Sequence, residues 1–242
     1  MSTQPPSLRL THHYALAARP LGRWWLNLRV RTTRAAWRWL VAGDGLARRA
    51  LDFTGASLFL LVFSPLYLAI ALAIKVEDAG PVFFVQTRVG RHGRVFRMFK
   101  FRSMCLDAEQ RLAELLARNH HADGVTFKLR EDPRITRTGR WLRRFSLDEL
   151  PQFFNVLAGD MSLVGPRPPV PREVALYSLA DRRRLAVKPG LTCLWQIGGR
   201  ATIDFSGQVR LDVEYIEHQS LATDLSILVR TPFAVISGRG AY

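Results

Sequence analysis

Residues 53–74 read FTGASLFLLVFSPLYLAIALAI, and this stretch decides how the rest of the chain is arranged. None of its 22 residues is charged, and as one helix they would extend about 33 Å, long enough to cross a bilayer. Ser64 and Pro65 stand at its middle. Proline kinks a helix by removing a backbone hydrogen bond, and serine can satisfy the freed group. The stretch therefore predicts a kinked membrane span, a hairpin that enters and leaves on one face, or a buried helix of a soluble core.

Basic residues flank this stretch on both sides: Arg48 and Arg49 precede it, and the residues that follow it include Lys75, Arg88, Arg91, Arg94 and Arg97. Cytoplasmic flanks of membrane segments are enriched in Lys and Arg, so a true span would place one basic flank on the wrong side. A re-entrant hairpin keeps both flanks in the cytoplasm and is favoured. A signal peptide is not expected, because the stretch begins beyond residue 50 and no small-residue cleavage site follows it.

The positive charge is concentrated in the first 50 residues. The chain of 242 residues has a formal net charge of +15, and residues 1–50 hold nine Arg against one acid, Asp44, a net of +8. Such a segment suits a polyanionic partner, either a nucleic acid or an anionic membrane surface. The Arg residues alternate with Trp24, Trp25, Trp37 and Trp39, a mixture that favours an amphipathic helix at the membrane interface. A solvated arm that folds onto the protein is the alternative.

Cysteine and histidine give no sign of a disulfide scaffold or a metal centre. Cys105 and Cys193 are far apart and outside any C-x-x-C pattern, which fits a reducing compartment. The six His residues show no metal-ligand spacing. Hydrophobic residues make up 48% of the chain and charged residues 23%, so we expect a packed core and not a disordered chain.

The part of the chain after residue 75 predicts an α+β fold that is predominantly helical. Two strands are expected at residues 81–86 and 95–101, joined by a turn that contains Gly90 and Gly93. Residues 164–171, VGPRPPVP, are expected to be irregular, because prolines cannot donate to a ladder. Composition and helical periodicity predict the following helices: 107–119, one that ends near Arg144, 150–157 closed by Gly159, 171–187, 206–218 and 221–236.

Residues 143–152 read RRFSLDELPQ and place two carboxylates side by side in a basic chain. Ser146 and Glu149 match a capping box, in which each side chain bonds the other residue's backbone N–H at a helix N-terminus. Asp148, near that N-terminus and beside Arg143, is expected to have a lowered pKa and to stay ionised as a nucleophile. The two interpretations are compatible, and spacing alone does not choose between them.

Several basic residues stand in segments framed by Gly and Pro. Guanidinium groups fork onto phosphate oxygens, and rigid loops hold them at little ordering cost. If these residues converge on the acidic pair, they form a site for a diphosphate, which needs a divalent ion to offset its charge. The candidates are Lys100, Arg102, Arg143, Arg167 and Arg200.

These motifs resemble the bacterial sugar transferases, the monotopic phosphoglycosyl transferases that begin glycan assembly on a polyprenol carrier. The resemblance extends from Leu51 to near the C-terminus. The matching stretches occur in series: the Ser64-Pro65 break, KFRSM at 100–104, DPRITRTGRWLRR at 132–144, SLDELPQFFNVLAGDMSLVGPRP at 146–168, KPGLTCLWQIGGR at 188–200 and LATDLSIL at 221–228.

The resemblance implies transfer of a sugar-1-phosphate, by default a hexose-1-phosphate, from a UDP-sugar to undecaprenyl phosphate, with release of UMP. It implies that Asp148 attacks the β-phosphate to form a phosphosugar-aspartyl intermediate, and that Glu149 orients Asp148 or assists proton transfer. The five basic candidates would hold phosphates. Mg²⁺ would lie beside Asp148, with Asp224 in support.

The resemblance also implies an arrangement in the cell: a basic segment at 1–50, a re-entrant membrane helix at 51–75 broken at Ser64 and Pro65, and a catalytic domain at 76–242. That domain, with interfacial amphipathic helices, would lie on the cytoplasmic face of the bacterial inner membrane, in contact with its lipid. Oligomeric state is not fixed by the sequence, and a homodimer stays open.

Two residues depart from the family's pattern. Pro169 stands where an apolar Leu is usual, and Gly198 stands where a polar residue such as Asn is common. Both bear on the sugar pocket and neither on the carboxylates. The competing hypotheses are a membrane-tethered nucleic-acid-binding protein and a scaffold without catalysis. The sequence lacks an RNP motif, a zinc finger and a recognisable helix-turn-helix, so no nucleic-acid partner is expected.

Overall fold

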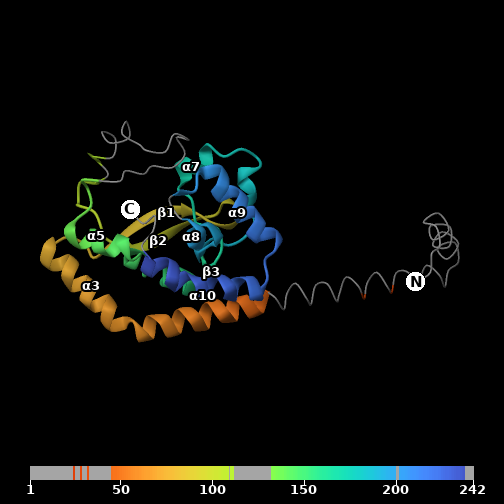
Figure 1. The fold of residues 1–242 in the computed structure, drawn as a ribbon, viewed down its shortest axis with the longest axis horizontal. Helices are drawn as coiled ribbons and strands as arrows, with labels where there is room; N and C mark the ends of the chain where they lie inside the picture. Colours follow the sequence, from red (N-terminus) through yellow and green to blue (C-terminus); the bar gives the residue numbers. More distant parts are fainter. Residues whose placement is uncertain are drawn as a thin grey trace. The chain divides into compact units, whose positions relative to one another are not determined.

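The computed structural model describes residues 45–108, 110–111, 132–199 and 202–237, together with Trp24, Leu28 and Thr32. Residues 49–242 form one compact unit, and the fold below is that of its described residues. Helices dominate them, and two sheets of two strands each lie among the helices (Figure 1). The predicted class, α+β and predominantly helical, is confirmed. The Arg/Trp-rich segment lies almost entirely outside the described residues.

The uncharged stretch folds as two helices joined at a sharp bend. The helix Gly45–Val62 and α3 (Ser64–Glu77) meet at 61°, with Phe63 between them. Pro65 lies in the first turn of α3, where its missing N–H needs no partner, and Ser64 Oγ donates to a carbonyl of the preceding turn at 2.9 Å. The break therefore falls where the sequence predicts it.

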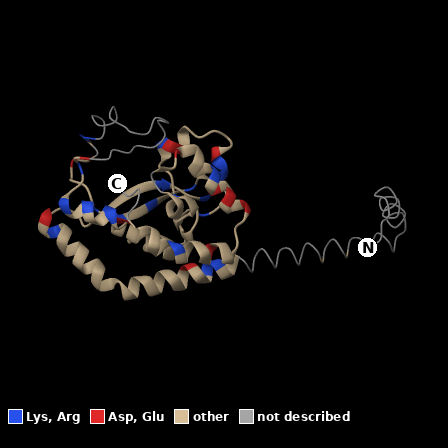
Figure 2. Cartoon of the chain, viewed as in Figure 1, with Lys and Arg blue, Asp and Glu red and all other residues tan. Residues whose placement is uncertain are grey.

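The bent pair carries its charged residues near its two ends (Figure 2). Within the described part of the chain, no single helix is long and apolar enough to cross a membrane. The two helices of the bent pair reach that length and hydropathy only when they are taken together.

The hairpin that the sequence predicts is present. β1 (Phe83–Val89) and β2 (Val95–Phe101) pair antiparallel, with β2 at its predicted bounds and β1 shifted toward the C-terminus. The turn between them takes a positive φ at His92 (56°) and Gly93 (81°). Such a φ is easy for glycine and uncommon for histidine.

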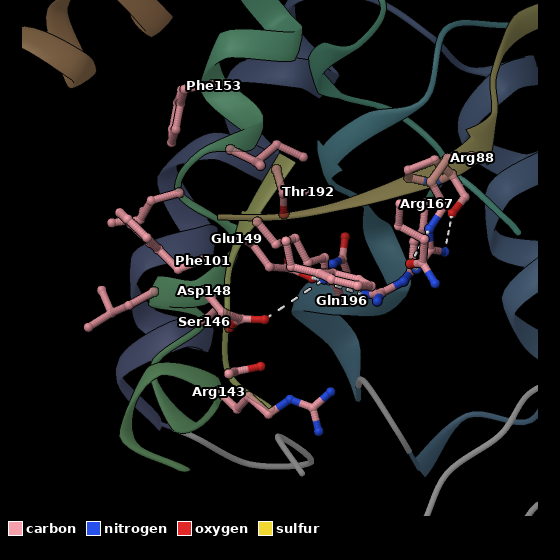
Figure 3. Close-up of a pocket in the computed structure, with 18 of the residues that line it drawn as sticks. Arg88, Phe101, Arg143, Ser146, Asp148, Glu149, Phe153, Arg167, Thr192 and Gln196 are labelled. Atoms are coloured by element: carbon pink, nitrogen blue, oxygen red, sulfur yellow. Dashed lines mark hydrogen bonds and ion pairs between the residues drawn. The ribbon is translucent and has the colours of Figure 1, made fainter. Parts of the chain in front are cut away.

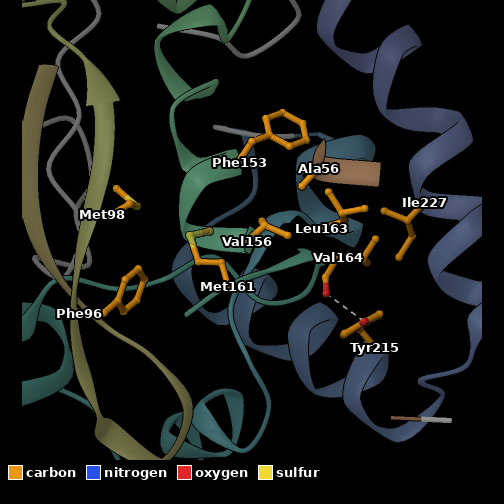
Figure 4. Packing of buried hydrophobic residues seen from close by; sticks show 10 residues of the cluster. All are labelled: Ala56, Phe96, Met98, Phe153, Val156, Met161, Leu163, Val164, Tyr215 and Ile227. Carbon is orange, nitrogen blue, oxygen red and sulfur yellow. Dashed lines mark hydrogen bonds between the residues drawn. The ribbon is translucent and has the colours of Figure 1, made fainter. Parts of the chain in front are cut away.

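The main core joins this hairpin to α6 (Gln152–Ala158) and to α10 (Leu221–Ser237). Asn155 holds α6 against β2, because its amide oxygen accepts the Phe99 N–H at 3.0 Å and its Nδ2 donates to Arg97 O at 2.7 Å. The residues buried in this core are shown in Figure 4: Ala56, Phe96, Met98, Phe153, Val156, Met161, Leu163, Val164, Tyr215 and Ile227.

A second sheet has no counterpart in the sequence prediction. β3 (Ser162–Val164) and β4 (Gly190–Thr192) pair in parallel. The two backbones approach so closely that a Cβ at Gly190 would lie 2.0 Å from Gly165 N. This contact fixes the start of the proline-rich segment, which is irregular from residue 165 to residue 170 as predicted.

Most of the predicted helices that fall on described residues are confirmed. α5 (Arg137–Arg144), α9 (Phe205–Glu217) and α10 lie at or near their predicted bounds, and Gly159 closes α6 with a φ of 87°. The short helix α8 (Leu194–Gly198) follows β4 and was not predicted. The helix predicted at residues 107–119 lies mostly outside the described residues.

The predicted helix at residues 171–187 is wrong. α7 (Pro171–Ala175) is a short helix, and η4 (Asp181–Leu185) is a separate 3₁₀ segment. Between them, the Ser178 N–H donates to the Asp181 carboxylate at 2.9 Å, and the Asp181 N–H donates to Ser178 Oγ at 3.2 Å. Side chains that bond nearby backbone in this way compete with the helical ladder and interrupt it.

Candidate active site

A cavity of about 1280 Å³ lies among β2, η3 (Leu147–Glu149), α10 and the proline-rich segment. One part of its wall carries charged groups: Arg88, Lys100, Arg143, Asp148, Glu149 and Arg167. Another part is apolar, and Phe101 and Phe153 lie on that side of the acidic pair (Figure 3). The apolar wall continues with Phe59, Phe63, Leu228, Pro232 and Val235.

The segment that carries the acidic pair is not capped as predicted. Ser146 has a left-handed conformation (φ 54°) and its side chain makes no capping hydrogen bond. The capping-box prediction is therefore wrong. Leu147 and Leu150 pack against a buried cluster that includes residues of α3, β2 and α5, and the chain there forms one 3₁₀ turn instead of a regular helix start. The acidic pair stands on that turn, ahead of α6.

Lys100 brings the acidic pair into one charge cluster. Its Nζ lies 2.7 Å from Glu149 Oε1 and 3.9 Å from Asp148 Oδ2. Arg167 Nη1 lies 3.5 Å from the same Glu149 oxygen. Glu149 is thus held by two cations, whereas the Asp148 carboxylate accepts no hydrogen bond from the described residues. Asp148 is the side chain of this cluster that is left to act on a ligand.

Burial sets the protonation behaviour of the cluster. It raises the pKa of Asp148, with Lys100 opposing it, so the predicted lowering by a helix N-terminus is wrong. A single 3₁₀ turn supplies no long helix dipole, and Arg143 makes no ion pair with Asp148. For Glu149, burial acts in the same upward direction, but Lys100 and Arg167 outweigh it and lower the pKa to about 2.

The structure brings three of the five predicted basic residues to the charged wall: Lys100, Arg143 and Arg167. Asp148 lies between Arg143 on one side and the pair Arg88 and Arg167 on the other (Figure 3). These groups come from β2, from the end of α5 and from the proline-rich segment, so the predicted convergence on the acidic pair is present.

The remaining predicted site residues have other positions. Arg102 borders the cavity, but its guanidinium bonds Asp78, with Nη2 at 3.0 Å from the backbone oxygen and 3.4 Å from the carboxylate. Asp224 is not part of the cavity wall; its carboxylate accepts the Tyr215 hydroxyl at 2.7 Å inside the core. Arg200 lies outside the described residues.

Arg88 is a site residue that was not among the predicted phosphate-binding residues; it was predicted only as part of a basic flank. Its side chain is buried. Its Nη1 donates to Pro168 O at 2.8 Å, and its Nη2 donates to Gln86 Oε1 at 2.6 Å. Burial lowers its pKa to about 10, and Arg167 adds to this effect. Arg88 therefore holds the loop that presents Arg167. The alternation along β1, which puts Arg88 on one face with Gln86, was the available signal.

Asp148 is the residue of the acidic pair that could hold a magnesium ion together with phosphate oxygens, because Lys100 and Arg167 already contact Glu149. Among the described residues, no group of three or more His, Cys, Asp or Glu side chains is placed to hold a metal ion. Magnesium needs fewer protein ligands when phosphates share it, because one or two carboxylates and water complete the octahedron. Asp148 faces the cavity, and its carboxylate accepts no hydrogen bond from the described residues, so it fits as one such carboxylate.

Comparison with known proteins assigns this site to a family. The family model described as "Bacterial sugar transferase" matches residues 43–238. These residues include the acidic pair and every described element from α3 onward. The chain belongs to the bacterial sugar transferase family. The predicted resemblance is confirmed, and the residues of the charged wall all fall within the part of this bacterial sugar transferase that matches.

Several relatives have names that describe a reaction. The chain is 50% identical to the galactosyl transferase CpsE of Streptococcus agalactiae serotype III (strain NEM316), over 81% of this chain and 43% of that protein. It is 43% identical to the exopolysaccharide production protein ExoY of Rhizobium meliloti (strain 1021), over 82% and 89%. It is 43% identical to the undecaprenyl-phosphate galactose phosphotransferase of Salmonella typhimurium, over 81% and 41%. This bacterial sugar transferase thus spans less than half of two of these relatives and most of the third.

Proposed function

We propose that the protein transfers a sugar-1-phosphate from a UDP-sugar to undecaprenyl phosphate and releases UMP, as the first step in assembling a surface polysaccharide. The observation that carries the proposal is the position of Asp148. It is a carboxylate that faces a cavity, has Lys100, Arg143 and Arg167 around it, and accepts no hydrogen bond from the described residues. Such a group can serve as a nucleophile toward phosphorus that cations have made electrophilic.

The first step is attack on the donor. A carboxylate oxygen of Asp148 bonds to the β-phosphorus, the bond from that phosphorus to the bridging oxygen breaks, and UMP leaves with the bonding pair. Arg167 and Lys100 are within reach of the diphosphate in this geometry, because both already contact the acidic pair. They offset the charge that gathers on the phosphate oxygens. The product is an acyl phosphate, a mixed anhydride of Asp148 and the sugar-1-phosphate.

The second step is attack by the acceptor. An oxygen of undecaprenyl phosphate bonds to the same phosphorus, and the Asp148–phosphorus bond breaks, which restores the carboxylate and leaves a polyprenyl diphosphate sugar. Glu149, held by Lys100 and with its pKa lowered to about 2, is a weak base. We therefore assign it the orienting role. A bound Mg²⁺, held by Asp148 and phosphate oxygens, would neutralise part of the charge of the diphosphate.

The apolar wall suits a lipid acceptor. Phe63 stacks on Phe59 at 4.3 Å between ring centroids, and Phe59 stacks on Phe153 at 4.0 Å. This row of rings runs from the bend between the two helices to α6, which directly follows the acidic pair. A prenyl chain laid along it would bring its phosphate to the charged wall. The row links the apolar hairpin with the site of chemistry.

Exposed apolar residues support placement of the bent pair in a membrane. The pair exposes Leu58, Leu61, Val62, Leu68 and Leu72, and a stripe on α10 exposes Leu225, Val229, Phe233 and Ile236. A soluble surface rarely carries so many large apolar side chains together. We propose that the bent pair is a re-entrant hairpin and that the domain lies on the cytoplasmic face of the bacterial inner membrane, where a lipid phosphate and a soluble nucleotide meet.

The sugar is proposed to be a hexose. Relatives are named for galactose and, in Komagataeibacter xylinus, for glucose, and one in Aeromonas hydrophila is named for N-acetylgalactosamine. The test is UMP release by the full chain in nanodiscs that contain undecaprenyl phosphate and Mg²⁺, with a panel of UDP-sugars. We expect release with UDP-glucose or UDP-galactose and its loss when EDTA is added. Folded protein that releases no UMP with any donor would contradict the proposal.

A further inference from the structure

Both helices of the bent pair make hydrogen bonds to the segment that directly follows the acidic pair, residues 150–157. From α3, the Tyr67 hydroxyl donates to Leu150 O at 2.6 Å. Leu150 directly follows Glu149 and ends the 3₁₀ turn. A side chain beside the bend is thus bonded one residue away from the acidic pair.

The other helix holds the opposite end of the same segment. Arg49 Nη1 donates to Val156 O at 2.7 Å, and Nη2 donates to Leu157 O at 2.7 Å. These carbonyls belong to the last turn of α6. The bent pair therefore makes hydrogen bonds to both ends of the stretch from residue 150 to residue 157. The helix α3 bonds its start, and the helix Gly45–Val62 bonds its end.

Packing reinforces the bond from Tyr67. Its ring contacts Phe101 of β2 at 5.3 Å between centroids and Phe154 of α6 at 6.1 Å. Leu147 and Leu150, the two residues that bracket the acidic pair, pack against the same buried cluster, to which α3 contributes Ile70 and Ile74. The helix α3 and both flanks of the acidic pair therefore share one cluster.

The 3₁₀ turn has little to hold it from within. It begins at Ser146, whose left-handed conformation is uncommon for a residue other than glycine, and it has no side-chain cap. Asp148 itself accepts no hydrogen bond from the described residues. The contacts that hold the turn from outside are therefore the Leu147 and Leu150 side chains, the carbonyl that Tyr67 binds, and the Glu149 carboxylate, which Lys100 and Arg167 hold.

We propose that Tyr67 is a positioning residue: its hydroxyl fixes the turn that carries Asp148 and Glu149 relative to the bent helix pair. The angle of the pair then determines where the nucleophile stands in the cavity. This inference rests on the proposed function for its effect on rate, but the bond to Leu150 acts on the turn whether or not a substrate is present.

The test compares Tyr67→Phe with Thr54→Val in the full chain in nanodiscs. Thr54 is a matched control, since its hydroxyl donates at 2.7 Å to Ala50 O within its own helix and does not reach α6. With a UDP-sugar that the wild type uses, we expect Tyr67→Phe to lower kcat about tenfold, because small misplacements of reacting groups cost large factors in rate. The KM for the donor should stay within about twofold, since the cations of the charged wall lie outside the turn and are unchanged.

Hydrogen exchange supplies a readout that needs no activity. The Phe153 N–H also bonds Leu150 O, at 3.0 Å, so a loosened carbonyl should speed exchange in a peptide that covers residues 147–154. We expect faster exchange there in Tyr67→Phe, unchanged exchange in β1 and β2, and neither change in Thr54→Val.

Wild-type kcat and exchange in Tyr67→Phe would overturn the inference. Faster exchange across the whole domain would also overturn it, because it would reveal a general loss of stability. A wild type that releases no UMP would defeat the proposed function and the rate effect with it. In that case the exchange at residues 147–154 alone decides whether Tyr67 holds the turn.

Discussion

The domain contains two buried charge clusters that differ in how their carboxylates are partnered. Around Asp212, the Arg184 guanidinium contacts the carboxylate directly, and Arg184 Nη1 also donates to Tyr177 Oη at 3.1 Å. The Arg184 Cζ lies 5.8 Å from the ring centroids of both Tyr177 and Phe205. Asp212 is 1% exposed, so its partner is fixed by the fold.

Around Asp148, the charges are matched more loosely. Lys100 contacts Glu149 closely and Asp148 only at 3.9 Å, and Arg167 is partly exposed. Asp148 is nearly as buried as Asp212 but opens onto the cavity. The difference teaches that a carboxylate in direct contact with its cation maintains structure, whereas a buried carboxylate whose cations are set back from it keeps its oxygens for a ligand. The predictions below test this contrast, beginning with the largest effect.

Replacing the nucleophile should separate activity from stability. Asp148→Asn should lower UMP release at least about 10³-fold, because an amide cannot form the acyl phosphate. Stability should not fall, since the Asp148 carboxylate accepts no hydrogen bond from the described residues and Lys100 Nζ lies 3.9 Å from it, so a neutral side chain loses no close contact. Asp204→Asn is the control: it changes an exposed Asp that caps α9 to a residue that caps as well. Full turnover in Asp148→Asn would remove Asp148 from its role.

Replacing the other buried carboxylate, Asp212, should lower the stability of the fold. Asp212→Asn leaves the Arg184 charge buried without its partner, and we expect a loss of about 3 kcal/mol in the free energy of unfolding. Urea unfolding in detergent measures it. The double replacement Arg184→Met with Asp212→Leu removes both charges and should recover most of the loss. A single variant that loses less than about 1 kcal/mol would erase the distinction between the two clusters.

The sequence was sufficient for features that depend on local pattern. The break at Ser64 and Pro65, the β1–β2 hairpin, and helices α9 and α10 follow from proline chemistry and from hydrophobic periodicity. The parallel sheet could not be foreseen in this way. Its strands have three residues each, and they pair because Gly165 and Gly190 permit close backbone contact across distant parts of the chain.

The candidate site was predictable in composition but not in pairing. Lys100, Arg143 and Arg167 do meet the acidic pair, as their Gly- and Pro-framed segments suggested. Arg102 is similar in sequence context, yet its guanidinium bonds Asp78. Ser146 matches a capping box, yet it has a left-handed backbone and no capping bond, beside leucines that pack into a buried cluster. Tertiary contacts decided each of these cases.

Removing a cation from the charged wall should give an intermediate effect. Arg167→Ala should raise the KM for the UDP-sugar about tenfold, the equivalent of one charged hydrogen bond, and change stability by less than about 0.5 kcal/mol. Steady-state UMP release measures the first and urea unfolding the second. Arg183→Ala is the control, because Arg183 pairs with Glu217 at 2.6 Å on the exposed surface. An unchanged KM in Arg167→Ala would place the diphosphate elsewhere.

Replacing an exposed carboxylate, Asp204, should have the smallest effect on stability. The effect should appear only at acid pH. The N–H of Gly207, at 2.9 Å, and the Ser206 hydroxyl, at 2.8 Å, bond the Asp204 carboxylate and lower its pKa. Because the folded pKa lies below the unfolded value of about 3.9, the stabilisation is present above that pH and is lost as the pH falls through the folded pKa. Asn at this position caps the helix without titrating. Unfolding midpoints of wild type and Asp204→Asn, followed from pH 6 to pH 3, should therefore diverge below about pH 4, with the wild type losing more. Parallel curves would mean that the cap is not a charged one.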